Sequence, residues 1–177
     1  MIKNIIYRIL LASFAFSSVN AWALKDDFKQ QIFIDADHAV IEQDKSVYSG
    51  NVVVTQGSMQ LKSARLEVYL VDRKPEKVVA TGNPVYMKQV VEPGKLERHG
   101  KASIAEYYIN KSLIILKGNA SVWLEENTGD GFGAKGDRID SDRITYDYKA
   151  EIVRAGKKGQ ADKNNRVHTI LNPRQDH

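Results

Sequence analysis

One alternating stretch, residues 48–70, constrains the fold of this chain more than any other part of the sequence. Its two apolar runs, residues 52–54 and 66–70, are β-branched or alternate with polar residues, a pattern typical of strands with one dry face. Gly57 lies between the runs and can adopt the positive φ that a tight hairpin turn requires. The stretch predicts a β-hairpin whose second strand places four apolar residues on one face: Ala64, Leu66, Val68 and Leu70.

A Gly-Asn pair before the first apolar run recurs along the chain. The pairs are Gly50-Asn51, Gly82-Asn83 and Gly118-Asn119, at offsets of roughly 30 to 40 residues, which suggest repeated supersecondary units. Each pair is followed by a strand-like run and then by a second one. Because one hairpin cannot bury its own apolar face, we expect the units to join into a longer sheet. The pattern predicts an all-β chain of a dozen or more short strands.

The first 23 residues have the pattern of a cleavable signal peptide. Lys3 and Arg8 precede an apolar run over residues 9–19, and Ala21-Trp22-Ala23 matches the small-x-small cleavage rule. The apolar run is shorter than the roughly 20 residues of a membrane span, which disfavours the alternative of an uncleaved anchor. We therefore expect residues 1–23 to be removed on export and residues 24–177 to form a single domain.

Export changes the charge of the chain. The full sequence has 26 Lys and Arg and 22 Asp and Glu, so loss of Lys3 and Arg8 leaves 26 − 2 = 24 basic side chains and a net charge of 24 − 22 = +2. A net positive charge this small does not suggest the basic stripe of a nucleic-acid-binding surface, so we expect no nucleic-acid partner. The sequence has no cysteine, so burial and hydrogen bonds must hold the domain together.

Three sets of residues resemble catalytic or metal-binding motifs. Residues 131–136 fit G-x-G-x-x-G, but no strand–helix pattern surrounds them, which favours a glycine-rich loop between strands. The acids Asp35 and Asp37, and likewise Asp140 and Asp142, alternate as the wet face of half-exposed strands would. The four histidines show no ligand spacing. We expect no catalytic site, no metal and no cofactor.

Several predicted strands carry apolar side chains on both faces, for example residues 32–34, 107–109 and 122–124. A sheet that folds over on itself would bury them in one of two ways. One face could line a groove for a lipid-like ligand, or the two faces could pack into a filled β-sandwich core. The pattern alone leaves both possibilities open.

Several segments, taken together, resemble the OstA-like domain family. They are residues 32–37, 48–57, 118–120 and 137–139, and residues 166–173 resemble the end of the family's periplasmic lipopolysaccharide-transport members. The likeness covers nearly all of the expected mature chain in one order. It implies a curved, open antiparallel β-jellyroll whose apolar interior holds the acyl chains of lipopolysaccharide in the periplasm.

The resemblance also implies particular residues and partners. The lipid-facing positions would be Ile32, Ile34, Met87, Tyr107 and Ile109. Met87 stands where an aromatic residue is common, and a one-residue slip after Pro84 would turn Tyr86 inward instead.

The resemblance implies end-to-end stacking through edge strands, which are ready surfaces for strand addition. The first strand would meet an inner-membrane component of the export machinery, and the last would meet an outer-membrane component or another copy. The residues of these two strands are Ile32, Phe33 and Ile34, and Val167, His168, Thr169, Ile170 and Leu171. The alternatives are a secreted β-rich scaffold with a filled core and a secreted lipid- or sugar-modifying enzyme, which would need convergent acids or histidines.

Overall fold

The computed structural model describes residues 27–127, 132–150, 152–156 and 166–171. The predicted signal peptide, residues 1–23, lies outside this range. The described elements are η1 (Asp27–Lys29), β1 (Ile32–Asp35), β2 (His38–Ile41), β3 (Lys45–Gln56), β4 (Met59–Val71), β5 (Lys74–Glu92), β6 (Leu96–Tyr108), η2 (Ile109–Lys111), β7 (Leu113–Asn127), β8 (Phe132–Asp147), β9 (Ile152–Ala155) and β10 (His168–Ile170).

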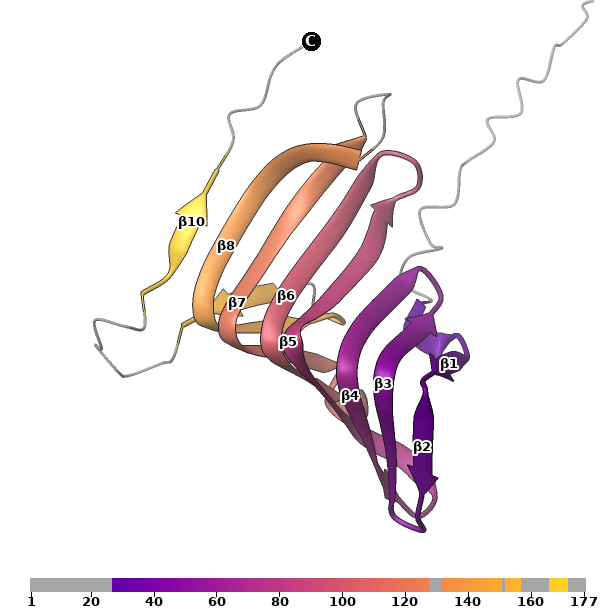
Figure 1. Cartoon of the computed structure of the whole chain (residues 1–177). Helices are drawn as coiled ribbons and strands as arrows, with labels where there is room; N and C mark the ends of the chain where they lie inside the picture. Colours follow the sequence, from indigo (N-terminus) through magenta and orange to yellow (C-terminus); the bar gives the residue numbers. More distant parts are fainter. Residues whose placement is uncertain (1–26, 128–131, 151, 157–165, 172–177) are drawn as a thin grey trace, which may run out of the picture.

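All ten strands of the described residues belong to one antiparallel sheet. The order is β1-β3-β4-β5-β6-β7-β8-β10, with β2 also paired to β3 and β9 also paired to β8. β1 and β2 therefore lie at one end of the sheet and β10 at the other (Figure 1). The all-β prediction and the opening hairpin, now β3 and β4, are confirmed.

Within the described ranges the strands are fewer and longer than the sequence predicted, because the Gly-Asn pairs bend strands instead of separating them. Each pair lies inside one long strand (β3, β5 or β7) where the pairing register shifts. Gly50 and Asn51 both have positive φ, and so do Gly118 and Asn119. A bulge of this kind turns a strand sharply without ending it.

The bends of neighbouring strands align, and the sheet folds over into two limbs (Figure 1). We call limb A the part made by residues 38–49, 65–81, 104–117, 143–150 and 152–155. We call limb B the part made by residues 32–35, 52–62, 85–101, 120–127, 132–141 and 168–170. The inner faces of the two limbs meet in one core, whose most deeply buried large side chains are Val52, Leu66, Val85 and Ile144.

Three details of the predicted strands are wrong. Ala64 is exposed although Leu66 and Val68 are buried as expected, because the register of β4 shifts between Lys62 and Arg65. The predicted glycine-rich loop is part of a strand from Phe132 onward. The strand expected to run through Ile109 ends at Tyr108, and Ile109 begins the short helix η2.

The outer face of limb A carries a network of charged and aromatic side chains around Glu67. The Glu67 carboxylate accepts hydrogen bonds from Tyr69 (2.6 Å) and Arg65 (2.9 and 3.1 Å), and Lys45 Nζ lies 3.1 Å from it. These partners, Tyr69 first, lower the pKa of Glu67 from 4.5 to about 2. Arg65, Glu67 and Tyr69 therefore lie on the face of β4 opposite to the buried Leu66 and Val68.

The bend in β3 predicts that Gly50 is more sensitive to substitution than another glycine of similar φ. A Cβ at Gly50 (φ +77°) would lie 2.9 Å from Asp37 Cβ, whereas nothing lies within 4 Å of one at Gly94 (φ +70°). We expect Gly94→Ala to cost about 1–2 kcal/mol from backbone strain alone, and Gly50→Ala to cost clearly more. Chemical denaturation measures both, and equal losses would contradict a close-packed bend.

The lowered pKa of Glu67 predicts acid-dependent stability. Above pH 4.5 the ionised carboxylate stabilises the fold, and this contribution is lost as the pH falls from 4.5 to about 2. The difference in free energy of unfolding between the wild type and Glu67→Gln should stay constant from neutral pH to about pH 5 and shrink below it. Glu76→Gln, at an exposed carboxylate of β5, is the control and should show no such convergence.

Candidate functional site: an apolar cavity between the limbs

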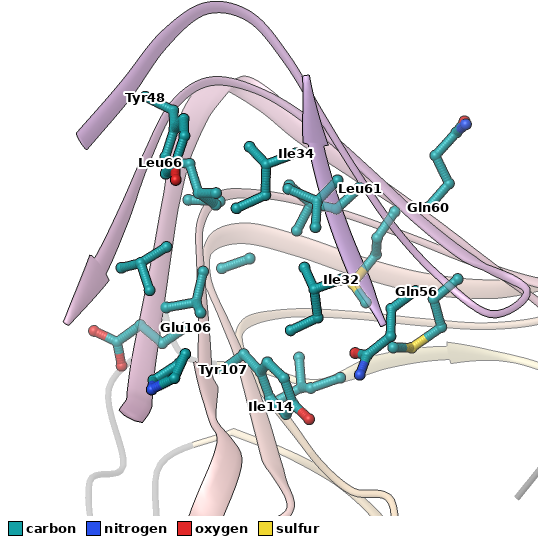
Figure 2. Close-up of a pocket in the computed structure, with 18 of the residues that line it drawn as sticks. Ile32, Ile34, Tyr48, Gln56, Gln60, Leu61, Leu66, Glu106, Tyr107 and Ile114 are labelled. Atoms are coloured by element: carbon teal, nitrogen blue, oxygen red, sulfur yellow. The ribbon is translucent and has the colours of Figure 1, made fainter. Parts of the chain in front are cut away.

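A cavity of about 310 Å³ opens between the two limbs of the sheet. This volume falls in the range of roughly 300–1,000 Å³ that ligand pockets occupy, well above an ordinary packing defect. Ile32, Ile34, Tyr107 and Ile114 face the same space in Figure 2, although they come from three different parts of the chain. The interior is therefore not a filled sandwich core.

Strand alternation places the apolar lining. On β4, Leu66, Val68 and Leu70 point into the cavity, while Glu67 and Tyr69 point outward. The other strands contribute in the same way, each with residues two apart on one face. Further lining side chains from β3, β5 and β6 are Tyr48, Val54, Val78, Ala80, Met87 and Ala105.

The ionisable groups at the cavity wall are held in defined states. Burial raises the pKa of the Tyr107 hydroxyl, and its hydrogen bond with Tyr148 (3.3 Å) adds to the effect, so Tyr107 is neutral near neutral pH. Burial acts to raise the pKa of Glu106, but Lys117 at 2.8 Å, Lys77 and Tyr108 together outweigh it and the pKa is lowered. Lys117 and Lys77 therefore balance the charge of Glu106, which lies between the inward-facing Ala105 and Tyr107 on β6.

The structure brings together four of the five side chains that the resemblance implied would face lipid: Ile32, Ile34, Met87 and Tyr107. Ile109, in η2, is not part of this lining. Met87 points inward, whereas the Tyr86 ring lies on the other face, 6.2 Å from the Trp123 ring, with its hydroxyl against His99. This is the register without a slip after Pro84.

Sequence reasoning missed much of the wall. Leu61, Val78 and Ile114 line the main cavity, and a smaller one of about 40 Å³ shares Met59, Met87 and Ile114 with it. The alternation within each strand was readable, but its phase changes along β4 and β5. On β4 the inward-facing residues change from Leu61 to Leu66 and Val68, and on β5 from Val78 and Ala80 to Met87. The sequence pattern alone does not show where these changes fall.

β1 and β10 are the edge strands at the two ends of the described sheet. β1 pairs with β3, and Phe33 on its outer face is 61% exposed. β10 pairs with β8 through His168, Thr169 and Ile170, and all three are exposed. Among the described residues, neither β1 nor β10 has a strand on its other side.

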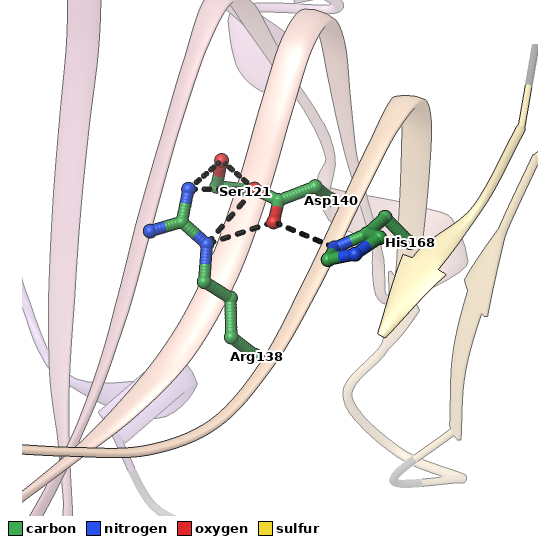
Figure 3. Close-up of polar contacts among 4 residues, drawn as sticks. All are labelled: Ser121, Arg138, Asp140 and His168. Atoms are coloured by element: carbon green, nitrogen blue, oxygen red, sulfur yellow. Dashed lines mark hydrogen bonds and ion pairs between the residues drawn. The ribbon is translucent and has the colours of Figure 1, made fainter. Parts of the chain in front are cut away.

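A polar cluster lies beneath β10 (Figure 3). Arg138 Nη2 is 2.7 Å from Asp140 Oδ1, Ser121 Oγ donates to the same oxygen at 2.5 Å, and His168 Nδ1 lies 3.9 Å from Oδ2. The hydrogen bond from Arg138 lowers the pKa of Asp140. Since the serine and the imidazole both contact the carboxylate and not each other, the cluster lacks the nucleophile–base pair of a hydrolase.

Two kinds of site are absent from the described residues. Neither Asp35 with Asp37 nor any other group of acids, histidines or cysteines there forms a cluster suited to a metal ion. Likewise, none of the helices in the described ranges has the length and apolar character needed to cross a bilayer.

Fold and cavity together define an open antiparallel β-jellyroll with an apolar interior and an unpaired edge strand at each end of its described sheet. Comparison with known proteins then places the chain more narrowly. The sequence model of the family described as LptA/(LptD N-terminal domain) LPS transport protein matches residues 33–152. The protein belongs to this family.

Individual relatives agree with that assignment. The lipopolysaccharide export system protein LptA of Haemophilus influenzae is 32% identical over 172 residues, covering 94% of this chain and 91% of the relative. LptH of Pseudomonas aeruginosa, with the same export-system description, is 32% identical over 147 residues, covering 81% and 78%. The crystal structure of LptH, described as the LptA-homologous periplasmic component of the lipopolysaccharide transport device, superposes with a TM-score of 0.68 at 26% identity over 84% of this chain and 99% of that one.

Proposed function

We propose that this protein binds lipopolysaccharide through its acyl chains and carries it across the periplasm from the inner to the outer membrane. The observation that carries the proposal is the apolar cavity of about 310 Å³ between the limbs. Family membership supplies the substrate class, and the predicted signal peptide supports an exported location. The action is binding and release, without a chemical step.

The energetics suit a passive carrier. Each methylene removed from water contributes about 0.8 kcal/mol, so even part of an acyl chain in the cavity is shielded by several kcal/mol. The wall offers contact area and few polar groups that would hold one ligand in one position. Transit requires binding that is not too tight, because a ligand that is held too tightly at one site does not move on.

The edge strands support contacts with partners. β1 and β10 are each paired on one side only in the described sheet, and each presents a row of unpaired backbone groups on its other side. Such edges accept a strand from another chain. We propose that β1 meets an inner-membrane component of the export machinery. β10 would meet an outer-membrane component or a second copy, giving end-to-end oligomers.

A charge in the cavity should weaken lipid capture. In Ile34→Asp a carboxylate without a partner faces the apolar wall, and binding of lipopolysaccharide should weaken by roughly ten-fold or more. Phe33→Asp is the matched control, because Phe33 belongs to the same strand but points outward, 61% exposed. Native mass spectrometry with purified lipopolysaccharide measures both, and full binding by a folded Ile34→Asp variant would contradict the proposal.

Removal of β10 should abolish stacking at that end while preserving lipid binding. The control is a chain ending at residue 171, which keeps β10. Compared with it, a chain ending at residue 166 lacks only residues 167–171, all of which are exposed. We expect a concentration-dependent ladder of oligomers for the control and its loss for the shorter chain. Ladders of equal length from both chains would show that β10 is not the contact.

A further inference from the structure

We propose that Arg98 is an anion-binding residue inside the cavity, which holds the phosphate group of a bound amphiphile while the acyl chains occupy the apolar wall. This inference rests on the proposed function and assigns a headgroup position within the same site. It begins from a charged side chain on the inner face of limb B.

The register places Arg98 inward. Its neighbours across the sheet are Gln89 on β5 and Leu124 on β7, and Gln89 lies two residues beyond the inward-facing Met87, hence on the same face. Arg98 and Gln89 both line the smaller cavity, which is continuous in its lining with the main one through Met59, Met87 and Ile114.

Arg98 spans the gap between the limbs. Its Nη1 donates to the Tyr146 hydroxyl of limb A at 3.2 Å, and its guanidinium lies 5.0 Å from the centre of that ring. The tyrosine ring supports the plane of the guanidinium and leaves other N–H groups available. Gln89 also lies at this end of the cavity, and its amide donates to the buried Asp27 carboxylate at 3.3 Å.

No carboxylate of the described residues forms an ion pair with Arg98. Outward-facing cations such as Arg65 and Arg138, by contrast, lie against carboxylates. A cation at an apolar wall gains most from an anion that arrives with the ligand. The planar guanidinium can bind two oxygens of one phosphate through two parallel hydrogen bonds.

The resulting site has two parts. The wall around Leu66 and Val78 takes hydrocarbon, and the polar end formed by Arg98 and Tyr146 takes an anion. This is the chemistry of a phosphorylated lipid. Free phosphate, without a chain, would lack the larger part of the contact area.

The test compares two amphiphiles with the same chain, dodecyl phosphate and dodecyl maltoside, by calorimetric titration into the full chain below their micellar concentrations. We expect the wild type to prefer the phosphate by roughly ten-fold, the effect of about one charge-assisted hydrogen bond. Arg98→Gln should lose that preference and bind the maltoside as the wild type does, which also verifies an intact cavity. Arg98→Lys should retain part of it, and Arg65→Gln, on the outer face, should retain all of it.

Each other outcome has a distinct meaning. Equal affinity of the wild type for both amphiphiles, or an unchanged preference in Arg98→Gln, overturns the role of Arg98 and leaves the lipid cavity standing. Binding of neither amphiphile overturns the proposed function, and this inference with it. Displacement of dodecyl phosphate by an equal concentration of inorganic phosphate would assign the residue to the free anion instead of a lipid headgroup.

Discussion

The aligned bends of the strands are the constraint on which the rest of this structure depends. At the Gly50-Asn51 and Gly118-Asn119 pairs the backbone has positive φ and the strand turns without losing its partners. The surroundings hold each bend in place: Asp37 accepts from the Asn51 amide at 2.9 Å, and Ser103 Oγ donates to the Gly118 carbonyl at 3.3 Å. Without these bends the strands would form one long twisted sheet with an apolar face in water.

The bends also explain why there is a cavity. The limbs meet tightly near the fold line, where Val52, Val85 and Ile144 are fully buried, and small residues such as Ala102 and Ala120 let the backbones approach. Farther from the line the limbs diverge, and Ile32, Leu70 and Tyr107 line open space. Core and ligand site are thus parts of one apolar surface, closed at one end and open at the other. Binding therefore requires no separate structural element.

The contrast between the faces of the sheet fits a carrier of amphiphiles. Outside, carboxylates such as Glu67 and Glu106 are matched with lysines and arginines, which keeps the outer face polar and internally balanced. Inside, Arg98 donates to the Tyr146 hydroxyl and forms no ion pair with the described residues. Such a division leaves the interior ready for hydrocarbon with one anionic end, and leaves the edges of β1 and β10 for contacts with other chains.

The sequence by itself determined the class of fold, because alternation along each strand is a local property: it shows in residues 48–70 without knowledge of any partner. Family-like segments also pointed to Ile32, Ile34, Met87 and Tyr107, which the structure places around one cavity.

Only the tertiary structure decided where the phase of that alternation changes, and so that Ala64 lies in water and Met87 inside. Only the folded sheet, likewise, brings Arg98 to Tyr146, 48 residues away in the chain. The physical reason is that a bulge is local, because it inserts an extra residue into a single strand. The meeting of the two limbs is not local, because it requires many strands to bend at the same level.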